Sequence, residues 1–370
     1  MSSNPNIDYA HRVPPELFQP IIQSIRSQAD LAAIALCCKD FSSDAQAQLF
    51  KNPFAGERSA RAHCRFLDAV ILSPHRLALH VRSYCQVTPQ FTQSGISQYR
   101  RENNPDYDRL IEQTRVGLPL MKNLKHLEYR PFSRSSMDAA GIVLQQCTFA
   151  HLESLDWWCQ GAERYLVEKV FPAHPKLKHL GVVWVSGVTA QTVVPSHLLR
   201  RLDSLRGGWS TFTAFMPGRN VTRLPWKRRS VHNEVMILGP ERLGEELVRV
   251  RYLAYDFPGP EMIFTLRALP DLEELELFVT SSGNAKSQLN SINVLKKLTA
   301  LVITARDGFP VDEYLEEETH REIAAIAFAV SSTLEYIDID SGDAVYSRYR
   351  AVRKNLSGVG SSISIIKVEL

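Results

Sequence analysis

The stretch Leu272-Glu273-Glu274-Leu275-Glu276-Leu277 shows the pattern that decides the fold: an apolar residue followed by two more, three and five positions later. The same spacing recurs through the last two thirds of the chain, and most intervals between starts are about 22 to 29 residues. Ten such triplets begin at Leu124, Leu152, Leu177, Leu202, Val221, Val250, Leu272, Leu298, Leu334 and Ile363. Repetition at this period indicates an array of structural repeats.

The spacing inside each triplet has a simple physical reading. The last two apolar residues are two positions apart, which is the period of a β-strand, so their side chains point to one face. The first residue lies on the turn before the strand and packs beneath them. One unit cannot bury such a face alone, whereas stacked units can. Helix-like stretches at 162–170, 262–268 and 316–330 lie between the strands, so the predicted fold class is α/β.

From Leu124 to its end the chain resembles the leucine-rich-repeat family. That resemblance implies an irregular solenoid over residues 121–370, with a parallel sheet on its concave face. The Asn that usually follows each strand in the family is missing, which implies divergent repeats and uneven curvature. The units at Leu202 and Val221 are the weakest copies. The alternative is an ordinary α/β sheet whose leucines fall at these positions by chance.

Residues 13–53 predict three short helices. Leu17, Ile21, Ile22 and Ile25 follow helical spacing after two prolines, and Asp30 is placed to cap a second helix. Three such helices bury too little apolar surface for an independent core. We therefore expect the rest of the chain or a partner to cover their apolar faces.

This run also resembles an F-box, the docking module of substrate receptors in cullin–RING ubiquitin ligases. Val13 stands where that family usually has Leu, and Phe50 where it usually has Trp. The resemblance implies docking to a Skp-type linker protein, and through it to a cullin, by Pro14, Leu17, Ile21, Ile22, Leu31, Ile34, Leu36, Cys38 and Phe41. The alternative is a helical cap that closes the end of the repeat array.

The remaining segments and the composition narrow the function classes. We expect a flexible N-terminus over 1–12, and connecting helices, an irregular first repeat and a polar insertion over 54–120. The net charge of +3 is too mild to indicate binding to nucleic acid or a membrane. The six cysteines form no C-x-x-C pair, which favours reduced thiols in a cytoplasmic or nuclear protein.

No catalytic pattern appears in the sequence. It contains no phosphate-binding Walker loop and no G-x-S-x-G nucleophile motif. His126 and His179 occupy the same repeat position, and His63-Cys64 has no further spaced ligands. We therefore expect no enzymatic activity, no metal and no cofactor. A basic run around Trp226 is interpreted as a solvated loop in preference to a nucleic-acid site: Arg219, Arg223, Lys227, Arg228 and Arg229.

Strand residues that alternate with the buried positions face the opposite side of the sheet. We expect a protein target to bind there, with Trp158 and Phe278 as exposed aromatic anchors. The predicted target-binding residues are Glu128, Arg130, Trp158, Arg223, Tyr252, Glu276 and Phe278. The sequence thus predicts a protein-interaction adaptor, the substrate-recognition subunit of a ubiquitin ligase. The alternative is a leucine-rich-repeat scaffold whose helical module only caps the solenoid.

Overall fold

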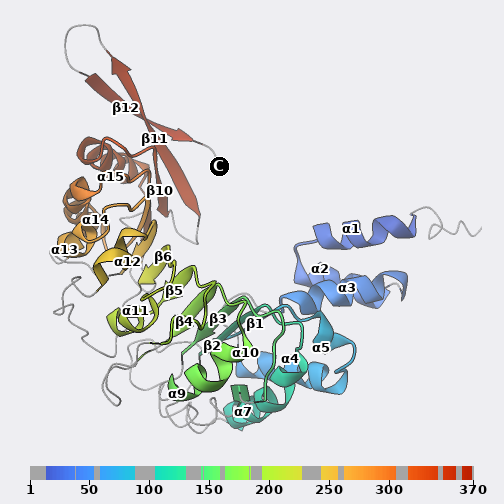
Figure 1. The fold of residues 1–370 in the computed structure, drawn as a ribbon. Helices are drawn as coiled ribbons and strands as arrows, with labels where there is room; N and C mark the ends of the chain where they lie inside the picture. Colours follow the sequence, from blue (N-terminus) through green and yellow to red (C-terminus); the bar gives the residue numbers. More distant parts are fainter. Residues whose placement is uncertain are drawn as a thin grey trace, which may run out of the picture. The chain divides into compact units, whose positions relative to one another are not determined.

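The chain is an α/β protein built mostly from parallel strands that alternate with helices (Figure 1). The computed structural model describes residues 14–37, 39–53, 59–87, 105–130, 143–144, 146–158, 163–182, 184, 194–226, 243–256, 262–305, 316–340, 345–355 and 361–368. The chain divides into two compact units, Met1–Lys176 and Leu177–Leu370.

The first unit opens with a helical module. A 3-10 turn at Pro15–Leu17 leads into α1 (Phe18–Ser24), which is followed by α2 (Gln28–Cys37) and α3 (Lys39–Lys51). These helices share a small core of their own, formed by Ile22, Leu31 and Ala45 with five partly buried side chains packed against it. The sequence predicts that the rest of the chain or a partner buries the apolar faces of these helices. The three helices instead bury part of these faces against one another.

Two longer helices and a short one follow the module. They are α4 (Ala60–Leu72), α5 (Leu77–His80) and α7 (Pro105–Gly117), with a 3-10 turn at Leu118–Leu120. Ser59 caps α4 by accepting a hydrogen bond from the Ala62 amide. The ring of Phe66 on α4 stacks against Phe50 of α3 and against Tyr84, with centroid distances of 5.5 and 5.7 Å. Tyr84 lies on β1 (Ser83–Val87), so this stack links the module to the first strand.

The first unit contains three parallel strands, and their order in the sheet is their order in the chain. They are β1, β2 (His126–Arg130) and β3 (Ser154–Trp157). Tyr84, Leu127 and Leu155 are paired in register, and all three are buried. The chain then forms α9 (Glu163–Tyr165), a π-helical stretch (Leu166–Val170) and α10 (Phe171–Ala173), where a helix was predicted.

The second unit continues the strand pattern with seven parallel strands. These are β4 (His179–Val182), β5 (Ser204–Arg206), β6 (Arg223–Trp226), β7 (Tyr252–Tyr255), β8 (Glu274–Val279), β9 (Ala300–Ala305) and β10 (Tyr336–Asp340). Their order in the sheet is their order in the chain. Leu224, Leu253, Leu275, Leu301 and Ile337 stand opposite one another, and each has at most 1% of its surface exposed.

Helices of this unit lie along one side of its strands (Figure 1). They are α11 (Trp209–Phe215), α12 (Gly244–Val248), α13 (Met262–Arg267), α14 (Ser282–Leu289) and α15 (Glu317–Val330), with a 3-10 turn at Asn290–Val294. The structure therefore has helices at 262–267 and 317–330, where the sequence predicted them. The apolar triplets pack beneath these helices, because a strand and a helix bury their apolar faces against each other.

A repeated backbone contact joins neighbouring strand–helix repeats at the turn before most of the parallel strands. The carbonyl of Arg251 accepts hydrogen bonds from the amides of Glu273 and Glu274, both at 2.9 Å. The carbonyl of Glu273 accepts from Thr299 and Ala300 in the same way, at 2.9 and 3.1 Å. Matching pairs begin at the carbonyls of Arg82, Lys125, Lys178, Asp203, Thr222 and Thr299. These backbone hydrogen bonds hold consecutive strands in register.

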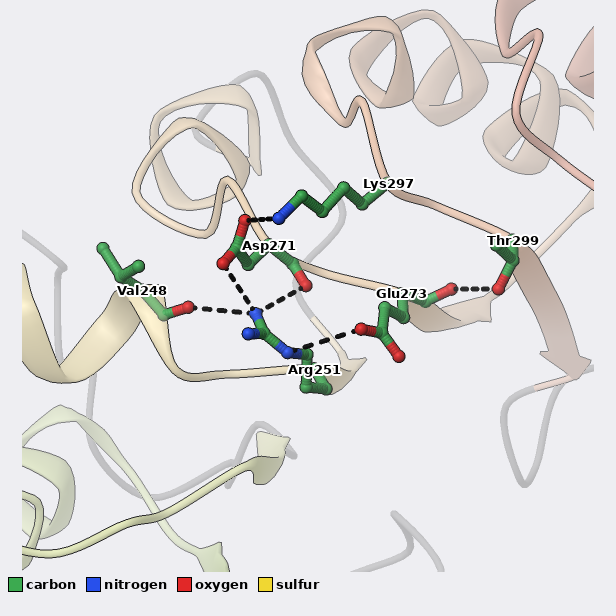
Figure 2. Close-up of polar contacts among 6 residues, drawn as sticks. All are labelled: Val248, Arg251, Asp271, Glu273, Lys297 and Thr299. Atoms are coloured by element: carbon green, nitrogen blue, oxygen red, sulfur yellow. Dashed lines mark hydrogen bonds and ion pairs between the residues drawn. The ribbon is translucent and has the colours of Figure 1, made fainter.

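Side chains reinforce these backbone contacts around Arg251 (Figure 2). Arg251 donates to the carbonyls of Val248 and Asp271, at 3.2 and 3.0 Å. Its guanidinium also pairs with the Asp271 carboxylate at 3.0 Å, and Lys297 reaches the same carboxylate at 2.6 Å. These contacts lower the pKa of Asp271, chiefly through the hydrogen bond from Lys297. The carboxylate therefore stays ionised and connects three consecutive repeats.

The weak triplet at Leu202 has a local cause. Its third position is Gly207, which follows the last residue of β5. A Cβ atom at Gly207 would lie 2.5 Å from the hydroxyl of Thr211 on α11. Glycine is needed here because the helix approaches the strand too closely for a side chain.

The final triplet, at Ile363, is not a repeat, and that part of the prediction was wrong. The chain instead forms an antiparallel hairpin of β11 (Tyr346–Asn355) and β12 (Ser361–Val368), with β11 antiparallel to β10. Ile366, expected in the core, is 48% exposed. Five residues separate β10 from β11, too few for the crossover that a parallel strand needs. The parallel array therefore ends at β10.

Candidate interaction surfaces

Several apolar side chains of the helical module stay on the surface. Leu17 is 49% exposed, Ile21 43% and Leu36 88%, and Pro14 is exposed ahead of them. Leu17 and Ile21 are four residues apart, so they lie on the same side of the first helical turns. Exposed side chains of this size on short helices are typical of a contact surface.

Other residues predicted at this surface lie inside the module. Ile22 and Leu31 are 2% and 3% exposed and form its core, and Ile34 and Phe41 pack against them. The ring of Phe41 lies 4.4 Å from that of Phe18. Ile22 and Leu31 therefore expose little surface of their own to a partner. Helical periodicity identifies apolar positions without showing which neighbour covers them. Cys38 lies outside the described residues.

In the first unit, the predicted strand residues form one polar cluster. Arg130 forms ion pairs with Glu128 and, at 3.8 Å, with Asp156. Its guanidinium carbon lies 4.5 Å from the centroid of the Trp158 ring, a cation–π geometry. All four side chains are partly buried. Strand alternation thus brought Glu128, Arg130 and Trp158 together on the face opposite the core.

Sequence reasoning missed one member of this cluster. The thiol of Cys85 donates a hydrogen bond to Glu128 at 3.3 Å, from the neighbouring strand β1. Burial and the Glu128 carboxylate raise the pKa of Cys85 to about 12. The thiol therefore stays protonated, which makes it a poor nucleophile. The apolar pair Val81 and Tyr84 has triplet spacing and is the signal that identifies this strand.

In the second unit, the predicted residues form a network across four strands. Arg223 stacks on the Tyr252 ring at 4.0 Å and lies 3.8 Å from Glu274. The Tyr252 hydroxyl donates to Glu276, which also accepts from Thr304 at 3.0 Å. Burial and the nearby Glu276 raise the pKa of Tyr252, so its phenol remains a hydrogen-bond donor.

The hairpin adds side chains that the sequence did not reveal. Arg348 on β11 forms two hydrogen bonds of 2.7 Å to Asp338 and lies 4.1 Å over the Tyr336 ring. Tyr346 approaches Thr304 at 3.2 Å. Arg348 therefore offsets the charge of Asp338 at this end of the face. Because β11 was not predicted as a neighbour of β10, neither side chain was considered.

Two further predictions need correction. Phe278 is only 9% exposed, so it is not an open anchor. Arg219 is 3% exposed and donates to five backbone carbonyls, at 2.6 to 3.3 Å: Val194, Pro195, Leu198, Phe215 and Pro217. Burial lowers its pKa to about 10, which leaves it charged at neutral pH. Trp226 is also buried, and residues 227–229 lie outside the described part. Arg219 and Trp226 are therefore not part of a solvated loop, whereas Arg223 is exposed.

Among the described residues, no cluster of three or more His, Cys, Asp or Glu side chains is placed to hold a metal ion. His126 and His179 both stand exposed at the first position of a strand, and His63 and Cys64 are buried in α4. In the same part of the chain, no helix has the length and apolar character needed to cross a membrane.

Comparison with known proteins gives little guidance. No protein-family model matches the sequence, and no curated protein matches it. A crystal structure of a Bacteroides fragilis structural-genomics target is similar over 72% of this chain and 75% of its own length. The two share 14% sequence identity, with a TM-score of 0.33. A likeness at that level defines neither the fold nor the function of this chain.

Proposed function

We propose that this chain is the substrate-recognition subunit of a ubiquitin ligase, with an F-box at its N-terminus. The observation that carries the proposal is the helical module ahead of the repeats. Its core holds three helices together while Leu17, Ile21 and Leu36 remain exposed. Such a surface suits docking to a Skp-type linker protein, which would place the chain on a cullin.

The strand array supports the second half of the proposal, a leucine-rich-repeat solenoid that holds a protein target. Its central apolar residues pair in register, and backbone hydrogen bonds of the same kind recur before most of its parallel strands. The opposite face presents arginines stacked on Trp158 and Tyr252, which are suitable anchors for a protein surface. Binding a target beside the transfer machinery raises its effective concentration, so the chain itself needs no reactive group.

One observation favours a second candidate, a repeat scaffold whose helical module is only a cap. The stack of Phe50, Phe66 and Tyr84 joins α3 to the first strand. The amide of Arg82 also donates to the carbonyl of Lys51 at 3.0 Å. A cap needs such contacts to close the array. It does not need exposed side chains such as Leu36, which is why docking is preferred.

The two candidates differ in what a surface change does. We would place charges on the exposed side of the module with the double variant Leu17→Asp, Leu36→Asp, and measure retention of the purified chain by immobilised Skp-type linker protein. Leu72→Asp is the matched control, because Leu72 is 82% exposed and lies on α4, outside the module. Docking predicts that the double variant is no longer retained by the linker protein while its circular dichroism matches that of the wild type. The Leu72→Asp control should be retained as the wild type is. Equal retention of all three proteins would favour the cap.

A further inference from the structure

A basic hollow lies between α4 and α7 in the first unit. Its volume is about 470 Å³, and its described lining consists of Arg61, Cys64, Arg65 and Arg109. Arg61 and Arg65 are four residues apart on α4, so their side chains leave the helix on the same side. Arg109 comes from α7, which packs against α4. Three arginines from two helices thus line one hollow.

Among the described residues, one carboxylate forms an ion pair with one of these three arginines. Arg109 pairs with Asp68 at 2.6 Å, and Asp68 also accepts a hydrogen bond from Gln113. Both Arg61 and Arg65 are exposed, and no carboxylate among the described residues forms an ion pair with either. Asp68 therefore offsets one guanidinium and anchors it in place. The other two add positive charge that no ion pair among the described residues offsets.

We propose that this hollow binds a phosphate group. Guanidinium donors suit the planar, bidentate geometry that phosphate oxygens accept, and two of them can share one dianion. The hollow has room for a phosphate together with the molecule that bears it. None of the three arginines belongs to the helical module, so the inference does not depend on docking to a linker protein.

Calorimetric titration of the full chain tests the proposal, with inorganic phosphate as the probe at constant ionic strength. Saturable binding is expected in the wild type, and at least tenfold weaker binding in the double variant Arg61→Gln, Arg65→Gln. Arg267→Gln is the control, because Arg267 is an exposed arginine on α13. It should bind phosphate as the wild type does. No saturable heat in the wild type, or equal affinity in the double variant, would overturn the proposal.

Two further readouts identify the chemistry and the source of the phosphate. Binding of O-phosphoserine should strengthen between pH 5 and pH 7, because the second ionisation of a phosphate monoester occurs near pH 6. Affinity that does not change over this range contradicts recognition of a dianion. Tighter binding of O-phosphoserine than of inorganic phosphate would identify a phosphate ester as the ligand, and the reverse would identify the free ion. The double variant Arg61→Lys, Arg65→Lys should bind more tightly than Arg61→Gln, Arg65→Gln but more weakly than the wild type, because lysine cannot form the bidentate contact of arginine.

Discussion

The stacked leucines of the second unit allow a stability prediction with a defined size. Leu275 is fully buried on β8, opposite Leu253 on β7 and Leu301 on β9, which are also fully buried. Leu275→Ala removes three carbons, worth about 2.4 kcal/mol at roughly 0.8 kcal/mol for each buried methylene. The cavity left between two fixed neighbours adds to this loss. We therefore expect a total cost of about 3 to 5 kcal/mol.

Urea unfolding followed by circular dichroism measures this cost. With a slope of about 1–3 kcal/mol per molar urea, the midpoint should fall on the order of 1 M or more. Leu72→Ala is the control: Leu72 is 82% exposed, so its substitution should change stability by no more than about 0.5 kcal/mol. A cost for Leu275→Ala close to that of the control would show that the leucines do not stack, and the repeat interpretation would fail.

Three other predictions follow from single side chains. Arg219→Met should lower the free energy of unfolding in urea by about 3 kcal/mol or more, because buried carbonyls lose their hydrogen-bond donor. A loss below about 1 kcal/mol would contradict the structural role of Arg219. His174 accepts from the Phe149 amide and donates to the Val170 carbonyl, and burial lowers its pKa below 6.5. The unfolded chain therefore takes up the proton first, so the stability from His174 should be complete above about pH 6.5 and decline below it. The stability difference between wild type and His174→Gln should shrink from pH 7.5 to pH 5, and a constant difference would refute this. Trp158→Ala should weaken capture of the protein target and leave linker binding unchanged; unaltered capture would move the target site elsewhere.

The sequence predicted the repeated strands because burial of an apolar triplet needs only local spacing. Leu127, Leu155 and Leu275 are buried and paired as that spacing required. The last triplet was wrongly predicted as a parallel repeat because its spacing also fits an antiparallel strand. Only the short connection after β10 distinguishes a parallel from an antiparallel strand here. Gly207 weakens the apolar triplet at Leu202 in the sequence, whereas in the structure it leaves space for the Thr211 side chain.

Local spacing also predicted part of the polar face of the strands, but it missed contacts made from outside the repeats. Strand alternation placed Arg130 beside Trp158, and Arg223 over Tyr252. It said nothing about contacts made by chain segments outside the repeat, so Arg348 was missed. The buried role of Arg219 was also hidden, because its partners are backbone carbonyls that no side-chain pattern reveals. In the helical module, periodicity did not separate the core residue Leu31 from the exposed Leu36.

The central claim is that the helical module is a docking element. Hydrogen–deuterium exchange of the full chain, with and without purified Skp-type linker protein, tests it most directly. The account predicts slower exchange at Phe18–Ser24 and Gln28–Cys37 when the linker protein is added, with the strands of the second unit unchanged. Exchange that stays the same in these two helices at saturating linker protein would contradict the claim.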